Sequence, residues 1–129
     1  MNQTPDPYLI SVHADSTFMD AESDEDTGRF VFAYTVTIRN EGTVPAQLLS
    51  RHWLVTDADG KVQEVKGDGV VGEQPLLKPG RSFQYTSAAL IETPRGTMHG
   101  TYQMRADDGT EFNAEIPVFS LSVPGLTLN

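Results

Sequence analysis

Apolar and polar residues alternate along most of the chain, a pattern that predicts half-buried β-strands rather than helices. The clearest case is residues 29–40, where one face of the predicted strand carries Phe30, Phe32, Tyr34, Val36 and Ile38. The opposite face carries Arg29, Thr35, Thr37 and Arg39. β-branched and aromatic residues of this kind suit a pleated surface with one side in the core. A shorter alternation over residues 8–14 predicts a second strand of the same type.

Five further segments read as strands: residues 46–57, 61–65, 81–88, 97–106 and 111–123. The turns "DADG" and "DDG" join two pairs of them as hairpins. Pro117 interrupts the last segment, which predicts a bulge or an edge position because proline cannot donate to a ladder. No segment has a helical apolar stripe with a cap and a stop, and no internal repeat is present. About seven strands predict an all-β, immunoglobulin-like (fibronectin type III-like) sandwich.

The third predicted strand contains the only tryptophan, Trp53, where such sandwiches often place a core residue. In the segment "LKPGRSF", Pro79 and Gly80 suit a type II turn. Its last residue, Phe83, stands where the fibronectin pattern has a tyrosine. Alternation also places Arg51 on the face of Trp53, which is unusual for a core-facing side. A β-bulge in this strand, or a covered outer face, would account for that placement.

Composition adds limits on size and partners. A chain of 129 residues predicts a single domain, with a core over residues 8–123 and tails at 1–7 and 124–129. Cysteine is absent and the first residues lack a signal-peptide pattern, so we expect a cytoplasmic protein. No apolar run is long enough to span a bilayer, which predicts no membrane insertion. The net charge of −9 argues against nucleic-acid partners, because polyanions are repelled.

The stretch "KGDGVVGEQP" contains a G-x-G-x-x-G motif, the pattern of a dinucleotide-binding turn. That reading requires a helix after the motif, and Pro75 forbids one. A P-loop requires Lys and Ser or Thr after its last glycine, but Glu73 and Gln74 follow here. We therefore interpret the glycines as serving the backbone of a long loop. A backbone anion site beside Lys66 and Arg81 remains the alternative.

The same loop is the candidate binding site, either for recognition or for an anion: Gly67, Gly69, Val70, Val71, Gly72, Glu73 and Gln74. Val70 and Val71 are adjacent, so alternation cannot easily bury both. If one is exposed, it offers an apolar anchor, with Glu73 and Gln74 supplying polar specificity. The competing interpretation is that both valines cover one end of the core.

Other candidate chemistry is weak. The acidic cluster within Asp20–Asp26 fails as an EF-hand because Glu25 occupies the position that requires glycine, and a solvated loop is the simpler interpretation. His13, His52 and His99 lack metal-ligand spacing, so no metal site is predicted. No G-x-S-x-G, cysteine or defined carboxylate pair is present, so we expect neither an enzyme nor a bound cofactor.

Several ordered motifs resemble those of the bacterial ApaG family: R-H-W before a T-D turn, G-x-G-V-V-G-x-Q-P, P-G-x-x-F-x-Y-T-S, and T-P-x-G-x-M-x-G-x-Y-x-M. The resemblance covers roughly residues 8–123 and implies an immunoglobulin-like sandwich. It also implies a link to cobalt resistance and magnesium efflux. Fused relatives, including an F-box protein and a polymerase-interacting protein, imply protein binding. The resemblance carries no catalytic residues.

These observations favour a non-enzymatic protein-interaction module with an unknown protein partner. The alternative is a regulatory protein that binds a nucleotide, pyrophosphate or a divalent cation through the glycine-rich loop, Gly67–Gly72. We expect at most weak binding of divalent cations or nucleotides to this acidic chain.

Overall fold

The computed structural model describes residues 6–125, so most of both predicted tails lies outside the described residues. Within that range the chain forms eight strands and two short 3₁₀ turns, η1 (Asp20–Glu22) and η2 (Glu25–Thr27). The strands are β1 (Ile10–Phe18), β2 (Phe30–Asn40), β3 (Ala46–Asp57), β4 (Val62–Asp68), β5 (Leu76–Leu77), β6 (Ser82–Ile91), β7 (Arg95–Ala106) and β8 (Glu111–Ser122). None of the helical segments in this range could cross a membrane.

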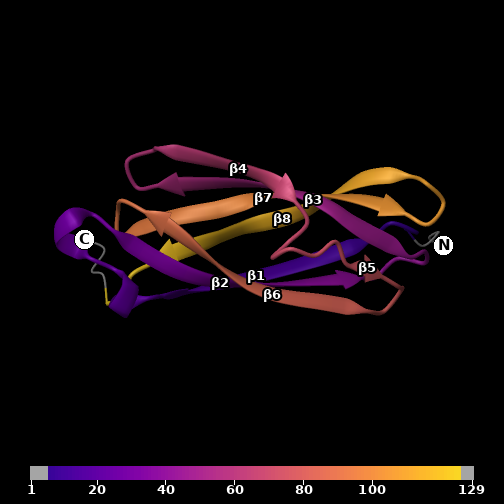
Figure 1. The fold of residues 1–129 in the computed structure, drawn as a ribbon, viewed down its shortest axis with the longest axis horizontal. Helices are drawn as coiled ribbons and strands as arrows, with labels where there is room; N and C mark the ends of the chain where they lie inside the picture. The colour runs from indigo at the N-terminus through magenta and orange to yellow at the C-terminus, as the bar shows by residue number, and fades with distance from the viewer. Residues whose placement is uncertain (1–5, 126–129) are drawn as a thin grey trace, which may run out of the picture.

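The strands form two sheets packed face to face, which confirms the predicted sandwich (Figure 1). One sheet has the order β1-β2-β6, and the other has the order β4-β3-β7-β8, with β5 paired to β3. All the pairings are antiparallel. The sequence pattern did not predict β5, because two residues are too few to show an alternation. It also ended the first strand at residue 14, whereas β1 continues to Phe18.

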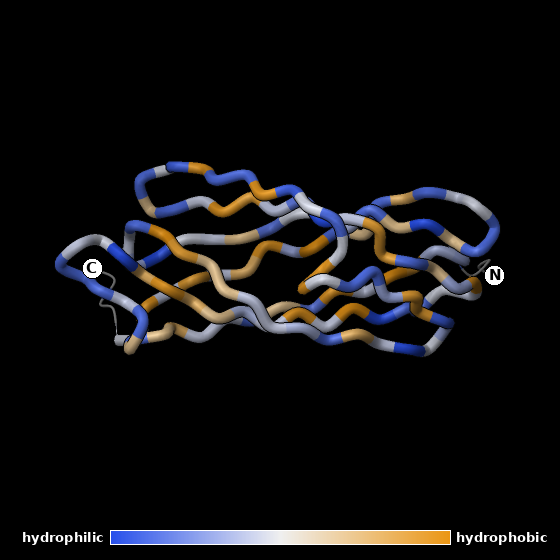
Figure 2. Tube along the Cα trace, viewed as in Figure 1, coloured by the Kyte–Doolittle hydropathy of each residue, from blue (hydrophilic) through white to orange (hydrophobic). Residues whose placement is uncertain are grey.

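The core lies between the sheets and is built from alternate residues of the long strands, so apolar and polar positions alternate along the trace (Figure 2). Trp53 is at its centre with 2% of its surface exposed, as predicted. Its ring meets those of Tyr34, Phe119 and Tyr102 nearly edge-on, with centroids 5.4, 5.9 and 6.3 Å away. Edge-to-face packing of this kind adds to the stabilisation from burial.

Two predicted irregularities are present in the ladder. The β3–β7 register shifts between Leu48 and Ser50, so a bulge separates Leu48 from the later inward-facing residues of β3. The bulge lies before both Arg51 and Trp53, so these two residues stay on the same inner face. A bulge in β3 is therefore present, but it does not account for the position of Arg51 as predicted. The β7–β8 register shifts opposite His99, at Pro117, and β8 is an edge strand. Both alternatives offered for Pro117 are therefore correct.

The turns also follow their sequence signals. Gly60 and Gly109 have φ values of 83° and 88° and end the two three-residue hairpin loops. The Lys78–Arg81 turn closes with a 3.0 Å bond from the Arg81 amide to the Lys78 carbonyl, and Gly80 has φ of 84°. This geometry is the predicted type II turn.

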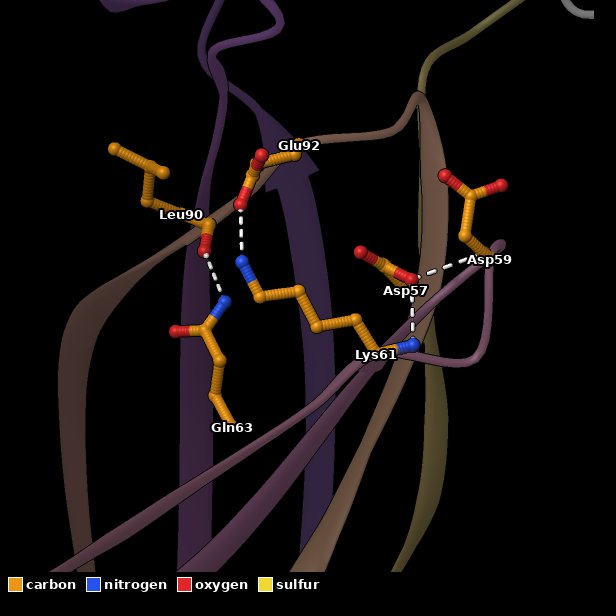
Figure 3. A network of polar contacts seen from close by, with 6 residues as sticks. All are labelled: Asp57, Asp59, Lys61, Gln63, Leu90 and Glu92. Atoms are coloured by element: carbon orange, nitrogen blue, oxygen red, sulfur yellow. Dashed lines mark hydrogen bonds and ion pairs between the residues drawn. The ribbon is translucent and has the colours of Figure 1, made fainter.

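The two flanks of the sandwich differ. On one flank β1 and β8 lie together, and the Ser16 hydroxyl donates to the Ser120 carbonyl across the sheets at 2.7 Å. On the other flank the edges of β4 and β6 face each other, and we call the space between them the seam. Side chains cross it at one end, where Gln63 donates to the Leu90 carbonyl and Lys61 pairs with Glu92 (Figure 3).

Candidate recognition loop and seam pocket

The glycine-rich loop was predicted to begin at Gly67, but β4 continues to Asp68, so Gly67 lies in the strand. After β4 the chain forms a tight two-residue hairpin turn. Val70 and Glu73 exchange backbone hydrogen bonds of 2.8 and 2.9 Å around Val71 and Gly72. Val71 has φ of 42° and Gly72 has φ of 83°. Two central residues with positive φ define a type I′ turn, which normally selects Asn-Gly or Gly-Gly. A β-branched residue in that position is a conformational outlier.

Three backbone amides of this loop donate to carbonyls of the protein. The amide of Gly69 donates to the Leu49 carbonyl at 2.9 Å, while the amides of Val70 and Glu73 donate to each other's carbonyls. Gly69 has φ of 62°, and a Cβ there would lie 2.3 Å from the Glu73 carbonyl oxygen. The predicted role of this glycine in the backbone therefore has a direct steric reason. The segment after the motif leads into β5 rather than into a helix.

The two adjacent valines have opposite environments. Val70 is fully buried in the core, whereas 56% of the Val71 surface is exposed. The prediction that Val70 belongs to the recognition surface is therefore wrong, because its side chain lies in the core. The competing interpretation, in which both valines cover the core, is also wrong. Gln74 is exposed, and its side-chain amide donates to the Leu49 carbonyl at 2.8 Å. The exposed tip therefore consists of Val71, Gly72 and Glu73.

A second feature lies in the seam, where a pocket of about 280 Å³ reaches from the edges of β4 and β6 to the core. We call it the seam pocket. Its lining residues are Tyr34, Arg51, Trp53, Val55, Gln63, Val65, Ser87, Ala88, Ala89, Leu90 and Met98. Val65 pairs with Trp53 and shares its inner face, yet 42% of its surface is exposed because it borders this opening.

Arg51 occupies an unusual position for a cation, on the inner face of β3 beside Trp53. Its Nη1 donates to the carbonyls of Asp68 and Gly69 at 3.0 and 2.9 Å. Gly67 allows this close approach, since a Cβ there would lie 2.8 Å from the guanidinium carbon. Among residues 6–125, no carboxylate lies within ion-pair distance of Arg51. The base of the glycine-rich loop therefore positions a guanidinium that lacks an acidic partner in the described structure.

Three tyrosines lie beneath Arg51. The hydroxyls of Tyr85 and Tyr102 are 2.5 Å apart and buried. Burial raises the pKa of Tyr85 to about 12, and it raises the pKa values of Tyr102 and Tyr34 as well. The positive charge of Arg51 opposes these increases in pKa. The buried Trp53 indole N–H lies by the Tyr85 hydroxyl, and this contact also opposes the increase in the Tyr85 pKa.

The acidic and histidine residues that were considered as metal ligands do not lie together. The acidic segment folds into η1 and η2, where the Asp24 side chain accepts from the Asp26 amide. His52 lies on the outer face of β3 and bonds Glu64 at 2.9 Å, a contact that lowers the Glu64 pKa. Within residues 6–125, no three histidine, aspartate or glutamate side chains gather in a metal-binding cluster.

Comparison with known proteins gives the family. The model of the ApaG domain matches residues 20–106, about two thirds of the chain. The chain belongs to the ApaG family. Protein ApaG from Thiobacillus denitrificans is 58% identical over 117 residues, which cover 91% of this chain and 92% of that protein. Protein ApaG from Pseudomonas aeruginosa is 55% identical over 118 residues, which cover 92% of this chain and 94% of that protein.

A solved ApaG-like structure agrees with the fold. The crystal structure of a Bordetella pertussis protein named ApaA superposes with a TM-score of 0.91 at 46% identity. That alignment covers 95% of this ApaG-family chain and 100% of the other chain. The R-H-W motif that marked the resemblance supplies both Arg51 and Trp53 of the seam pocket. Sequence reasoning noticed Arg51 only as a charged residue on the face of Trp53, and that anomaly was the available signal for the pocket.

Proposed function

We propose that this ApaG-family chain is a non-enzymatic protein-interaction module, and that the loop tip formed by Val71, Gly72 and Glu73 contacts the partner. The observation that carries this proposal is the conformation of Val71. A valine with φ of 42° is strained, and most of its surface is exposed. Strain of this kind persists where the surroundings fix the backbone, and it collects at functional positions.

The tip is held rigidly by its own base. Val70 is anchored in the core, the Val70–Glu73 pair closes the turn, and the amide of Gly69 is tied to Leu49. A rigid element loses little conformational entropy on binding, which favours affinity. Val71 then offers a small apolar contact, and Glu73 beside it offers a charged one, as at the centre and rim of many interfaces.

Phosphate binding is the weaker alternative. A cradle for pyrophosphate requires several backbone amides directed outward, but those of Gly69, Val70 and Glu73 all donate to carbonyls of the protein. The loop also directs the carbonyls of Asp68 and Gly69 toward Arg51. A role in cobalt and magnesium homeostasis, which the family resemblance implies, fits as a consequence of binding a cytoplasmic protein.

The test is affinity capture from a cytoplasmic extract with the wild type and two valine variants. Val71→Asn keeps the turn and removes the apolar tip, so it should lose the captured partner. Val118→Asn is the matched control, because Val118 is 64% exposed on the opposite flank. Equal capture by all three proteins would place recognition elsewhere. A saturable shift of the Val71 and Gly72 amides with pyrophosphate would instead support the anion alternative.

A further inference from the structure

The seam pocket combines a cationic end with apolar walls. Arg51 has five N–H groups, of which the described structure uses one nitrogen for two carbonyl acceptors. A half-buried guanidinium without an acidic partner is costly, and such charges are usually paired. Val55, Val65 and Met98 line the rest of the pocket. A ligand that suits both parts has one carboxylate and a short apolar group.

Trp53 and Ser87 also line the pocket. The Trp53 indole N–H lies by the Tyr85 hydroxyl, and the Ser87 hydroxyl lies by the Tyr34 hydroxyl; each contact lowers the pKa of its tyrosine. These two donors already face protein oxygens, so Arg51 is the group of the lining that favours a carboxylate over a neutral or cationic group.

The edge of β6 identifies the kind of molecule that would carry the carboxylate. β6 pairs with β2 on one side only. The Leu90 carbonyl accepts from Gln63 across the seam, so the backbone groups of Leu90 face away from β2. By alternation in an antiparallel ladder, those of Thr86 and Ala88 face the same way. An extended peptide can pair with this edge, as in other complexes in which a strand is added to a sheet.

We propose that the seam pocket binds the C-terminal residue of a partner polypeptide, which extends β6 as an added strand. The terminal carboxylate contacts Arg51, and the apolar side chain of the last residue lies against Val55, Val65 and Met98. This inference deepens the proposed role as a protein-interaction module, but it does not require the loop tip. The net charge of −9 repels polyanions, so an isolated carboxylate fits this chain better than a phosphate-rich ligand.

The test uses the single tryptophan of the chain, whose indole N–H gives one cross-peak in a ¹⁵N NMR spectrum. The probe is acetyl-Thr-Val-Thr-Leu with a free carboxylate. We expect a saturable shift of the Trp53 indole signal and slower exchange of the Thr86 and Ala88 amides. The same peptide as a carboxamide should bind at least about tenfold more weakly, since it lacks the charge-assisted contact.

Acetyl-leucine has the same terminal carboxylate as the peptide but no preceding residues, so it tests whether a small carboxylic acid binds as well as a peptide C-terminus. It should bind at least about tenfold more weakly than the peptide, because it cannot pair along β6. Equal binding of the two acids would overturn the edge-strand part of the proposal. Equal binding of acid and carboxamide, or an indole signal that does not move, would overturn the carboxylate site.

Variants localise the effect. Val65→Phe narrows the pocket and leaves Arg51 in place, so it should abolish the indole shift. Val62→Phe is the matched control, because Val62 is exposed on the same strand and does not line the pocket.

Arg51→Gln should weaken binding of the peptide acid at least about tenfold while leaving binding of the carboxamide unchanged. Val71→Asn should leave the titration unchanged, so failure of the loop tip and failure of the pocket are distinguishable. Retained peptide binding by Val65→Phe would overturn the assignment to this pocket.

Discussion

The adjacent valines of the loop allow a sharp stability experiment, because one is strained and the other is buried. Replacing Val71 with asparagine gives Asn-Gly, the preferred pair for a type I′ turn. The left-handed backbone costs a residue such as valine about 1–2 kcal/mol, and asparagine tolerates it better. Full burial of a valine side chain stabilises by about 1.5–3 kcal/mol, so the covered part of Val71, a little under half, is worth about 1 kcal/mol.

These two contributions nearly cancel. We expect the free energy of unfolding of Val71→Asn to equal that of the wild type or to exceed it by up to about 1 kcal/mol. Val70→Ala should lose about 2–3 kcal/mol, because Val70 is fully buried and its truncation leaves a cavity. For a domain of this size, that loss lowers the melting temperature by about 10 °C.

Thermal denaturation followed by circular dichroism measures both values. A melting temperature of Val71→Asn more than about 5 °C below the wild type would show that Val71 is held by packing rather than strained. A Val70→Ala variant as stable as the wild type would contradict the burial that separates the two positions.

Four further outcomes follow from the core, the ladder and one hairpin turn. The raised pKa values of Tyr85 and Tyr102 mean that the folded state holds more protons than the unfolded state above pH 10, so stability should fall between pH 10 and 12. Denaturant titrations should show this decline, and Tyr85→Phe should reduce it. Gly100→Ala should lose about 1–3 kcal/mol in chemical denaturation, because its Cβ would lie 2.0 Å from a β3 carbonyl oxygen. Gly109→Asn, at an open turn with positive φ, should change stability by less than about 1 kcal/mol. Trp53→Ala should cost about 3–5 kcal/mol, measured in the same way.

Most of the fold could be predicted from the sequence because period-two alternation carries its own structural meaning. The third strand was predicted as residues 46–57, which are the bounds of β3. A bulge in this strand was one of two alternatives, and the observed bulge lies before Arg51, so the parity of Arg51 and Trp53 did not locate it. Pro117 indicated an edge position, because a proline has no backbone N–H to donate to a neighbouring strand. β5 was missed because its pairing with β3 is decided by tertiary contacts rather than by local pattern.

The candidate site was less predictable for a physical reason. In a loop no alternation rule applies, so the sequence could not tell which of Val70 and Val71 is buried. The hydrogen bond from the Gly69 amide to the Leu49 carbonyl fixes the backbone there, and the fixed backbone determines which valine is buried. The seam pocket depends on residues from β2, β3, β4, β6 and β7, and only the fold brings them together. Arg51 was visible as an anomaly, but its lack of an acidic partner is a property of the three-dimensional arrangement.

The contact between β1 and β8 has a consequence for synthesis of the protein in the cell. β1 emerges from the ribosome early, whereas β8, which lies beside it across the sandwich, emerges about 100 residues later. Until Glu111–Ser122 has emerged, the edge of β7 lacks the strand that pairs with it, and the core lacks Ala114, Ile116 and Leu121. Nascent chains with exposed apolar surface and unpaired strand edges are prone to aggregation. Ribosomes that stall before this last hairpin should therefore present a chain that depends on chaperones.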